Sequence, residues 1–343
     1  MTTVQPAQIS LEKSQFLKGL AIIMVVVIHT LAYLPGIYTT SQFQIFYIAI
    51  DQLGRFCVPL FLLLSGYGLA VKYKDEVPAW VPFLKKRVLK LIPLYLIWSV
   101  VSHTLLSIIP AWESIGPSQP LWYQLLTGSS DYQLYFVVLI FQLYALFPFF
   151  LKLVKKFPLL TLFTSFAIQL GVFAYYYNNE LPGQFNLDGF QYIFFVSWIG
   201  YFVLGIWLAL KPLPVKLIKI FLPLMFIGAT IVVWDSWYLI KNYTDPLLAL
   251  KFTRWPVMLY AVVLILWMIT RSELGVLKVP LSNWIQKVLN YLGKQSYLIF
   301  LAHTIGLRII FSAERNLISI PLIVLLTCTW LTTILFSQKV SSQ

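Results

Sequence analysis

The stretch FLKGLAIIMVVVIHT, residues 16–30, places one lysine and one histidine in a segment that is otherwise mostly apolar. It belongs to a chain of 343 residues, of which 59% are hydrophobic and only 11% are charged. Soluble domains carry about 25% charged residues, so lipid is the solvent for most of this chain. A helix crosses a bilayer with about 20 mostly apolar residues, because its backbone polar groups are satisfied within the segment. The stretch therefore predicts a first membrane helix.

Nine further segments are long and apolar enough to cross a bilayer. The ten predicted spans are 16–34, 53–72, 88–109, 133–152, 157–177, 190–210, 217–238, 254–270, 291–311 and 317–337. The sequence thus predicts an all-α, polytopic membrane protein. We expect a polar N-terminal tail at 1–15, a ten-helix membrane domain at 16–337 and a C-terminal tail at 338–343.

The net charge of +13 reflects membrane orientation and gives no support for a nucleic-acid partner. Most of the 25 basic residues fall in connections on the same side as the N-terminus, whereas most acidic residues fall on the other side. Cytoplasmic connections of membrane proteins carry an excess of Lys and Arg, so both termini are predicted to be cytoplasmic. The surplus also favours contact with anionic lipid head groups in the bilayer.

Few other motifs compete for the function. The two cysteines, Cys57 and Cys328, lie within or beside predicted spans, so neither a disulfide framework nor a metal site is predicted. The sequence contains no phosphate loop and no dinucleotide fingerprint. Any chemistry must therefore use side chains in or near the bilayer.

Lys18 and His29 share one face of the first predicted helix. They are eleven residues apart, which corresponds to about 20° around the helix and about 16 Å along it. Taken singly, Lys18 would reach the interface with its long side chain, and His29 would hydrogen-bond a neighbouring helix. An ionisable residue such as Lys or Arg inside a membrane costs about 2.5–3.5 kcal/mol and usually faces a cavity or pathway. The aligned pair therefore predicts a functional cavity along this helix.

Two stretches near the N-terminus match the motifs of a known membrane family. LKGLAIIMVVVIH (17–29) resembles the opening signature of acyltransferase family 3, in which an arginine or lysine is followed by ten residues and a histidine. VPLFLLLSGYGLA (58–70) resembles the family's second helix, an apolar run that ends in Ser-Gly-Tyr or Ser-Gly-Phe. These three positions are Ser65, Gly66 and Tyr67.

Three later stretches extend the resemblance, in order, along nearly the whole chain. FLKKRVLKLIPLYL (83–96) resembles the basic start of helix three, LYFVVLIFQLYALFPFF (134–150) the fourth helix, and LGKQSYLIFLAHTI (292–305) the penultimate helix. The matching residues include Arg87, Lys90, Ser296, Tyr297 and His303. The chain departs from the commoner pattern at Lys18 and Lys90, where the family usually has arginine, and at Tyr135, where it often has tryptophan.

The resemblance implies an enzyme that moves an acyl group, often acetyl, from cytoplasmic acyl-CoA to a hydroxyl of an extracytoplasmic acceptor. The implied acceptor is a glycan or a lipid-linked molecule, acyl-CoA is a co-substrate with no permanently bound cofactor, and the expected location is the bacterial inner membrane. Acetyl and succinyl groups both fit, and the sequence does not set the oligomeric state. A transporter or flippase of a polysaccharide or lipid-linked sugar is the alternative. It would release no free CoA thiol.

Roles follow for the residues that carry the motifs. His29 is expected to act either as a general base on the acceptor hydroxyl or as a nucleophile on the thioester. Lys18, Arg87 and Lys90 are expected to bind the donor phosphates, although ordinary positive-inside charge also explains basic residues there. Asp131 is expected to orient His29 or to bind acceptor hydroxyls. Asp51 and Glu113 are rival acids, and a solvated loop carboxylate is the alternative for each.

The small and polar residues of the motifs have two interpretations. The residues Ser65, Gly66, Tyr67, Ser296 and His303 either line a narrow acyl or pantetheine tunnel beside His29 or serve helix packing. Glycine and serine let membrane helices approach closely, so packing is as well supported as a tunnel.

Overall fold

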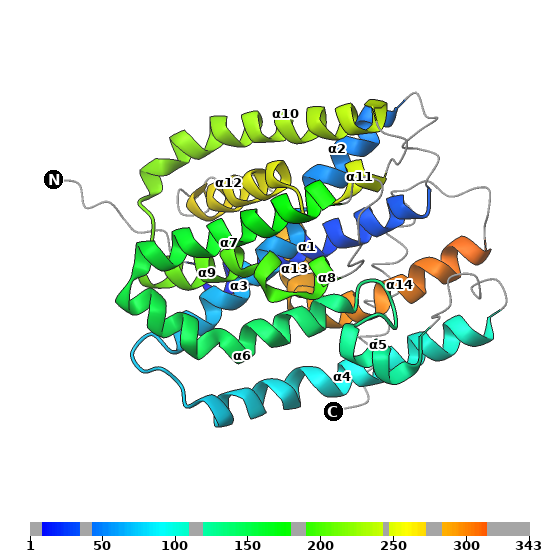
Figure 1. Ribbon diagram of the computed structural model, residues 1–343, viewed down its shortest axis with the longest axis horizontal. Helices are drawn as coiled ribbons and strands as arrows, with labels where there is room; N and C mark the ends of the chain where they lie inside the picture. Colours follow the sequence, from blue (N-terminus) through cyan, green and yellow to red (C-terminus); the bar gives the residue numbers. More distant parts are fainter. Residues whose placement is uncertain are drawn as a thin grey trace.

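The structure is a computed structural model that describes residues 9–34, 43–109, 119–179, 190–242, 247–271 and 283–313. These residues form helices and no strand, which confirms the predicted all-α class. Most of the long helices run roughly along the longest axis of the molecule, as Figure 1 shows. This arrangement is a helical bundle of the kind that membrane spans require.

The described helices follow one another along the chain. They are α1 (Leu11–Ala32), α2 (Gln44–Gly54), α3 (Cys57–Lys72), α4 (Trp80–Ile108), α5 (Leu121–Thr127), α6 (Tyr135–Lys156), α7 (Pro158–Asn179), α8 (Phe190–Ile193), α9 (Ile199–Leu210), α10 (Ile218–Asn242), α11 (Leu247–Leu250), α12 (Trp255–Arg271), α13 (Asn283–Lys294) and α14 (Ser296–Ala313), with 3₁₀ turns η3 (Phe195–Ser197) and η4 (Val215–Leu217).

Six helical segments among the described residues are long and apolar enough to cross a membrane. They are Leu11–Ala32, Gln44–Lys72, Trp80–Ile108, Tyr135–Lys156, Pro158–Tyr176 and Val215–Asn242. Three predicted spans correspond to shorter apolar helices, Ile199–Leu210, Trp255–Thr270 and Ser296–Phe311. The predicted tenth span, 317–337, lies outside the described residues, so the count of ten and the cytoplasmic termini stay predictions.

The outer helices present apolar side chains outward. On α4, α7 and α10, Leu89 is 64% exposed, Phe163 68% and Phe226 63%. A helix face of this kind in a soluble protein would lack a partner, whereas in a bilayer it contacts acyl chains. The six long segments and these exposed faces identify an integral membrane protein.

The second predicted span differs from its sequence boundaries. It begins at Gln44, nine residues before the predicted start, and it is broken between α2 and α3. Pro59 explains the break, because proline has no N–H to donate and its ring clashes with the carbonyl four residues earlier, that of Arg55. Asp51, near the end of α2, forms an ion pair with Arg55, which follows the helix: Arg55 Nη2 lies 2.8 Å from Asp51 Oδ1.

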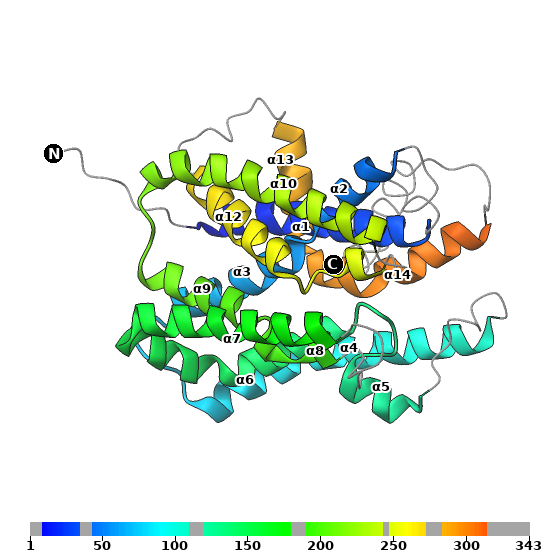
Figure 2. The same ribbon diagram turned by 45° about the horizontal axis from the view of Figure 1, so that its top comes forward.

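The predicted span 291–311 is also divided. A separate amphipathic helix, α13, ends at Lys294 and α14 begins at Ser296. Figure 2 shows α13 at a steep angle to α1. Two glycines permit this close crossing: a Cβ at Gly19 would collide with the Leu289 carbonyl, and one at Gly293 with the Gln15 carbonyl. The crossing fixes the start of α14, which carries His303, relative to α1, which carries His29.

Gly66 serves a similar contact between α3 and α9. A Cβ at Gly66 would collide with the Phe202 carbonyl, and one at Gly205 with the Leu63 carbonyl. Small residues allow this backbone-to-backbone approach. The geometry therefore favours the packing interpretation for Gly66.

Candidate active site

One cavity of about 270 Å³ brings together most of the residues predicted to bind the donor. We call it the cationic cavity. Its polar lining residues are Lys18, Ser65, Arg87, Lys90, Lys294 and Ser296, with the hydroxyl-bearing rings of Tyr144 and Tyr297. The described lining contains no Asp or Glu. Residues from α1, α3, α4, α6, α13 and α14 thus converge on a single site.

The four cations of this cavity have no counter-ion among the described residues. None of them forms a salt bridge with another described residue. The Arg87 Nε is buried and has no hydrogen-bond partner there. Its guanidinium lies over the rings of Phe83 and Tyr144, at 5.2 and 5.5 Å from their centroids. Lys18 and Arg87 are partly buried, whereas Lys90 and Lys294 are exposed at the same cavity. Because like charges gathered around one cavity repel each other, this arrangement favours an anionic ligand.

His29 and His303 meet at the other end of α1. The distance between His29 Nδ1 and His303 Nε2 is 2.5 Å. The ring planes differ by only 9° and the centroids are 4.8 Å apart. Face-to-face rings cannot bring two nitrogens so close, so the rings lie edge to edge with the hydrogen bond in their common plane. His303 is fully buried, whereas His29 is partly exposed.

Aromatic side chains connect the histidine pair to the cationic cavity. Phe136 and Phe300 line that cavity and pack together with centroids 5.2 Å apart. The Phe300 ring lies 6.0 Å from the His303 ring. Phe61, which lines the cavity as well, lies 6.3 Å from Phe136. Aromatic side chains at one end of the cationic cavity thus lie between the cations and the imidazoles.

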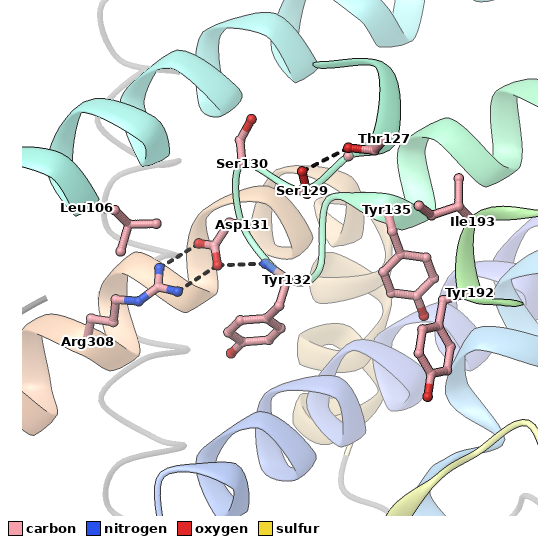
Figure 3. A pocket seen from close by; sticks show the side chains of 11 residues that line it. Leu106, Thr127, Ser129, Ser130, Asp131, Tyr132, Tyr135, Tyr192, Ile193 and Arg308 are labelled. Carbon is pink, nitrogen blue, oxygen red and sulfur yellow. Dashed lines mark hydrogen bonds and ion pairs between the residues drawn. The ribbon is translucent and has the colours of Figure 1, made fainter. Parts of the chain in front are cut away.

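A second cavity, of about 310 Å³, lies on the opposite side of the histidines. We call it the tyrosine cavity, and Figure 3 shows its lining. Its lining residues include Ser129, Ser130, Asp131, Tyr132, Tyr135, Tyr192 and Arg308. Tyr132, at 43% exposure, meets the His29 ring edge to face with centroids 4.9 Å apart. His29 therefore lies between the two cavities, with Phe300 and His303 on one side and Tyr132 on the other.

Asp131 is bound by α14 and not by His29. Its carboxylate accepts two hydrogen bonds from Arg308, each 2.6 Å, and one of 2.8 Å from the Thr304 hydroxyl. Figure 3 shows the paired contacts with Arg308. Among the described residues His29 has no carboxylate partner; its hydrogen-bond partner is His303. The expectation that Asp131 orients His29 directly is therefore replaced by an indirect connection through α14.

The other predicted residues are distributed as follows. The Tyr67 hydroxyl accepts a 2.9 Å hydrogen bond from the Ile9 N–H and does not line either cavity. Asp51 is paired with Arg55, and Glu113 lies outside the described residues. The described residues contain no group of three His, Cys, Asp or Glu side chains that could hold a metal ion.

Sequence reasoning missed three residues of the site. Lys294, within the stretch LGKQSYLIFLAHTI, was not singled out, although it lines the cationic cavity. Thr304 and Arg308 were not singled out. Their spacing of four residues on an apolar helix that also carries His303 was an available signal, because residues four apart share a helix face.

A family model described as an acyltransferase domain matches residues 12–337, nearly the whole chain. The chain belongs to acyltransferase family 3. No curated protein and no solved structure matches it significantly.

Membership of acyltransferase family 3 assigns membrane acyl transfer to this chain in general terms. An acyltransferase of this kind needs a donor site, an acceptor site and a group that handles a proton or an acyl chain between them. This family 3 acyltransferase has two cavities of different chemistry and a partly exposed imidazole between them.

Proposed function

We propose that this acyltransferase binds acyl-CoA in the cationic cavity and transfers its acyl group, through His29, to an acceptor hydroxyl in the tyrosine cavity. The acyl group is most simply acetyl, and the acceptor is an extracytoplasmic glycan or lipid-linked molecule. The observation that carries the proposal is the set of four cations, Lys18, Arg87, Lys90 and Lys294, that line one cavity with no carboxylate in its described lining. Family membership favours this transferase over a transporter.

The donor assignment rests on charge and shape. Coenzyme A is a polyanion, and charge-assisted hydrogen bonds to phosphate are about twice as strong as neutral ones. Arg87 offers a buried, unpartnered Nε together with a guanidinium that aromatic rings hold in place. The apolar end of the cavity, lined by Phe136 and Phe300, suits an apolar acyl chain with its thioester. The end of the molecule that carries Lys18 would then face the cytoplasm.

The acceptor assignment rests on the tyrosine cavity. Its one described cation, Arg308, is paired with its one described carboxylate, Asp131, so the lining is electrically balanced. Ser130 is fully buried and its hydroxyl has no hydrogen-bond partner among the described residues. Tyr135 and Tyr192 offer aromatic rings with centroids 6.2 Å apart. Rings and hydroxyls without net charge suit an uncharged, hydroxyl-rich acceptor.

His29 has two chemically balanced routes. As a base it takes the proton of the acceptor hydroxyl, whose oxygen attacks the thioester carbonyl; the C–S bond breaks and the thiolate leaves with a proton as free CoA thiol. As a nucleophile it first accepts the acyl group on a ring nitrogen, releases the thiol, and then passes the acyl group to the hydroxyl. Both routes yield an ester and one equivalent of CoA thiol.

The test uses inverted membrane vesicles from cells that produce the protein, because their cytoplasmic face is exposed to added acyl-CoA. Acetyl-CoA with a radiolabelled acetyl group is supplied, and thiol release is followed together with base-labile label in the glycan and lipid fractions. We expect both signals to appear with the wild type and to be lost with His29→Ala. Wild-type vesicles that release no thiol while moving a glycan across the membrane would establish the transporter instead.

A further inference from the structure

The hydrogen bonds of His303 determine which of its ring nitrogens carries a proton. Its Nδ1 lies 2.8 Å from the Phe300 carbonyl oxygen and 3.2 Å from the Ile299 carbonyl oxygen. A carbonyl oxygen only accepts hydrogen bonds, so Nδ1 of His303 must be the donor. The ring is fully buried and has no carboxylate among its partners, and an unpaired buried charge is unfavourable. His303 is therefore neutral, with its proton on Nδ1 and a lone pair on Nε2.

This tautomer of His303 sets the tautomer of His29. The His303 Nε2 faces the His29 Nδ1 at 2.5 Å, in the common plane of the two rings. Since His303 Nε2 can only accept, His29 Nδ1 must carry the proton that joins them. The lone pair of neutral His29 then lies on Nε2, the nitrogen that points away from His303.

We propose that His303 is a positioning residue that holds the proton of His29 on Nδ1 and so presents His29 Nε2 as the reactive nitrogen. The reactive role of His29 rests on the proposed function; the tautomer does not. When Nε2 takes the proton of the acceptor hydroxyl, His29 becomes an imidazolium. Its Nδ1–H stays in place and donates a hydrogen bond to Nε2 of the neutral His303. The pair thus follows the logic of a catalytic base oriented by a third group. Here the third group is an imidazole anchored on a backbone carbonyl.

The neighbouring contacts keep His303 in this position. Thr304 and Arg308, on the same helix, bind Asp131 in the loop before α6. Gln133 in that loop donates to the Thr304 hydroxyl at 2.8 Å. The loop also carries Tyr132, whose ring contacts His29. One polar cluster therefore fixes α14, and with it His303, against both His29 and its aromatic neighbour.

The tautomer can be observed directly because the chain contains only three histidines. Ring-¹⁵N-labelled histidine is incorporated into the full chain in nanodiscs, and protonated and unprotonated ring nitrogens are distinguished by their ¹⁵N chemical shifts. His103→Gln removes the third signal; it serves as the matched control because His103 lines neither cavity. We expect wild-type His29 to be protonated on Nδ1 and unprotonated on Nε2. A proton on Nε2 of wild-type His29 would overturn the proposal without any variant having to fold.

Variants of His303 connect the tautomer to turnover. His303→Leu removes the acceptor, so we expect a mixed His29 tautomer and a kcat about 10²-fold lower, with KM for acetyl-CoA nearly unchanged. His303→Gln keeps an amide oxygen close to the place of Nε2, so it should restore the Nδ1–H tautomer and most of kcat. A folded His303→Leu protein with the wild-type tautomer and kcat would refute the positioning role.

The same experiments separate the positioning role from the proposed function. If His29→Ala retains acyl transfer, the proposed function of His29 is wrong, whatever the tautomer. If His29→Ala is inactive and His303→Leu is fully active, only the positioning role is wrong.

Discussion

The two cavities differ in how their charges are paired. In the cationic cavity Lys18, Arg87, Lys90 and Lys294 have no carboxylate within the described lining. In the tyrosine cavity the single described cation, Arg308, is held by two 2.6 Å hydrogen bonds to Asp131. Breaking a buried ion pair is costly because it leaves a charge without its partner, whereas a group of like charges without a carboxylate remains available to a ligand. The comparison therefore separates the proposed donor site from a structural clamp beside the proposed acceptor site.

The largest effect is expected at the histidine between the cavities. His29→Ala removes the base or acyl carrier, so acyl transfer should fall by about 10²–10⁴-fold. Donor binding should persist, because His29 does not line the cationic cavity. Turnover and acetyl-CoA affinity are measured on the same purified protein. A parallel loss of both would mean that the cavities are not separate in function.

A change in stability is expected when the clamp is broken. Asp131→Asn leaves the buried Arg308 without its counter-ion, which costs about 3–5 kcal/mol of unfolding free energy. Thermal unfolding in nanodiscs should therefore shift to lower temperature, while the folded variant keeps its affinity for acetyl-CoA.

Asp235→Asn is the matched control for the clamp. Asp235 is paired with Arg254, but its side chain is 21% exposed, and Arg254 keeps hydrogen bonds to Gln52, Ser236 and the Ala249 carbonyl. The loss of stability should be smaller. Equal losses in the two variants would show that burial of the Asp131 pair carries no special weight.

An effect on the donor is expected from Arg87. Arg87→Ala should weaken acetyl-CoA binding about ten- to a hundredfold, since a hydrogen bond to a charged group contributes about 1.5–3 kcal/mol. Lys86→Ala is the control, because Lys86 is exposed on the same helix and does not line the cavity. Equal weakening in both variants would point to general surface charge and would remove the distinction between the cavities.

The smallest effect is expected at Lys18. Lys18→Arg keeps a cation in the cavity, so donor affinity should be nearly unchanged. Lys18→Ala should cost about 1.5 kcal/mol of binding free energy, the lower end for a charged hydrogen bond. Titration of both variants with acetyl-CoA checks the order. An arginine variant as weak as the alanine variant would show that the lysine is needed for more than its charge.

The sequence predicted the cationic cavity better than the tyrosine cavity for a physical reason. Helical periodicity places Lys18 on the face of His29, and the motifs around Ser65, Arg87, Lys90 and Ser296 are local patterns that survive folding. Lys18, Ser65, Arg87, Lys90 and Ser296 line one cavity, and His29 contacts His303 beyond the aromatic end of that cavity.

The partners of Asp131 and His29 depended on tertiary structure. Arg308 is 177 residues from Asp131, and His303 is 274 residues from His29. No local pattern specifies such pairs. Similarly, the predicted span began at 53 and missed most of α2, because Asp51 was interpreted as a solvated loop acid, although it is paired with Arg55 at the end of that helix. The all-α class needed only composition and apolar segment lengths, which are local properties of the chain.

Equilibrium binding of coenzyme A and of pantetheine, which lacks its nucleotide phosphates, tests the central claim most directly. The account predicts that the wild-type protein binds coenzyme A more tightly than pantetheine. It also predicts that the Arg87→Ala, Lys90→Ala double variant loses most of that difference, while Asp131→Asn keeps it. Equal affinity of the wild type for both ligands, or a difference that survives in the double variant, would contradict the assignment of the cationic cavity to the donor.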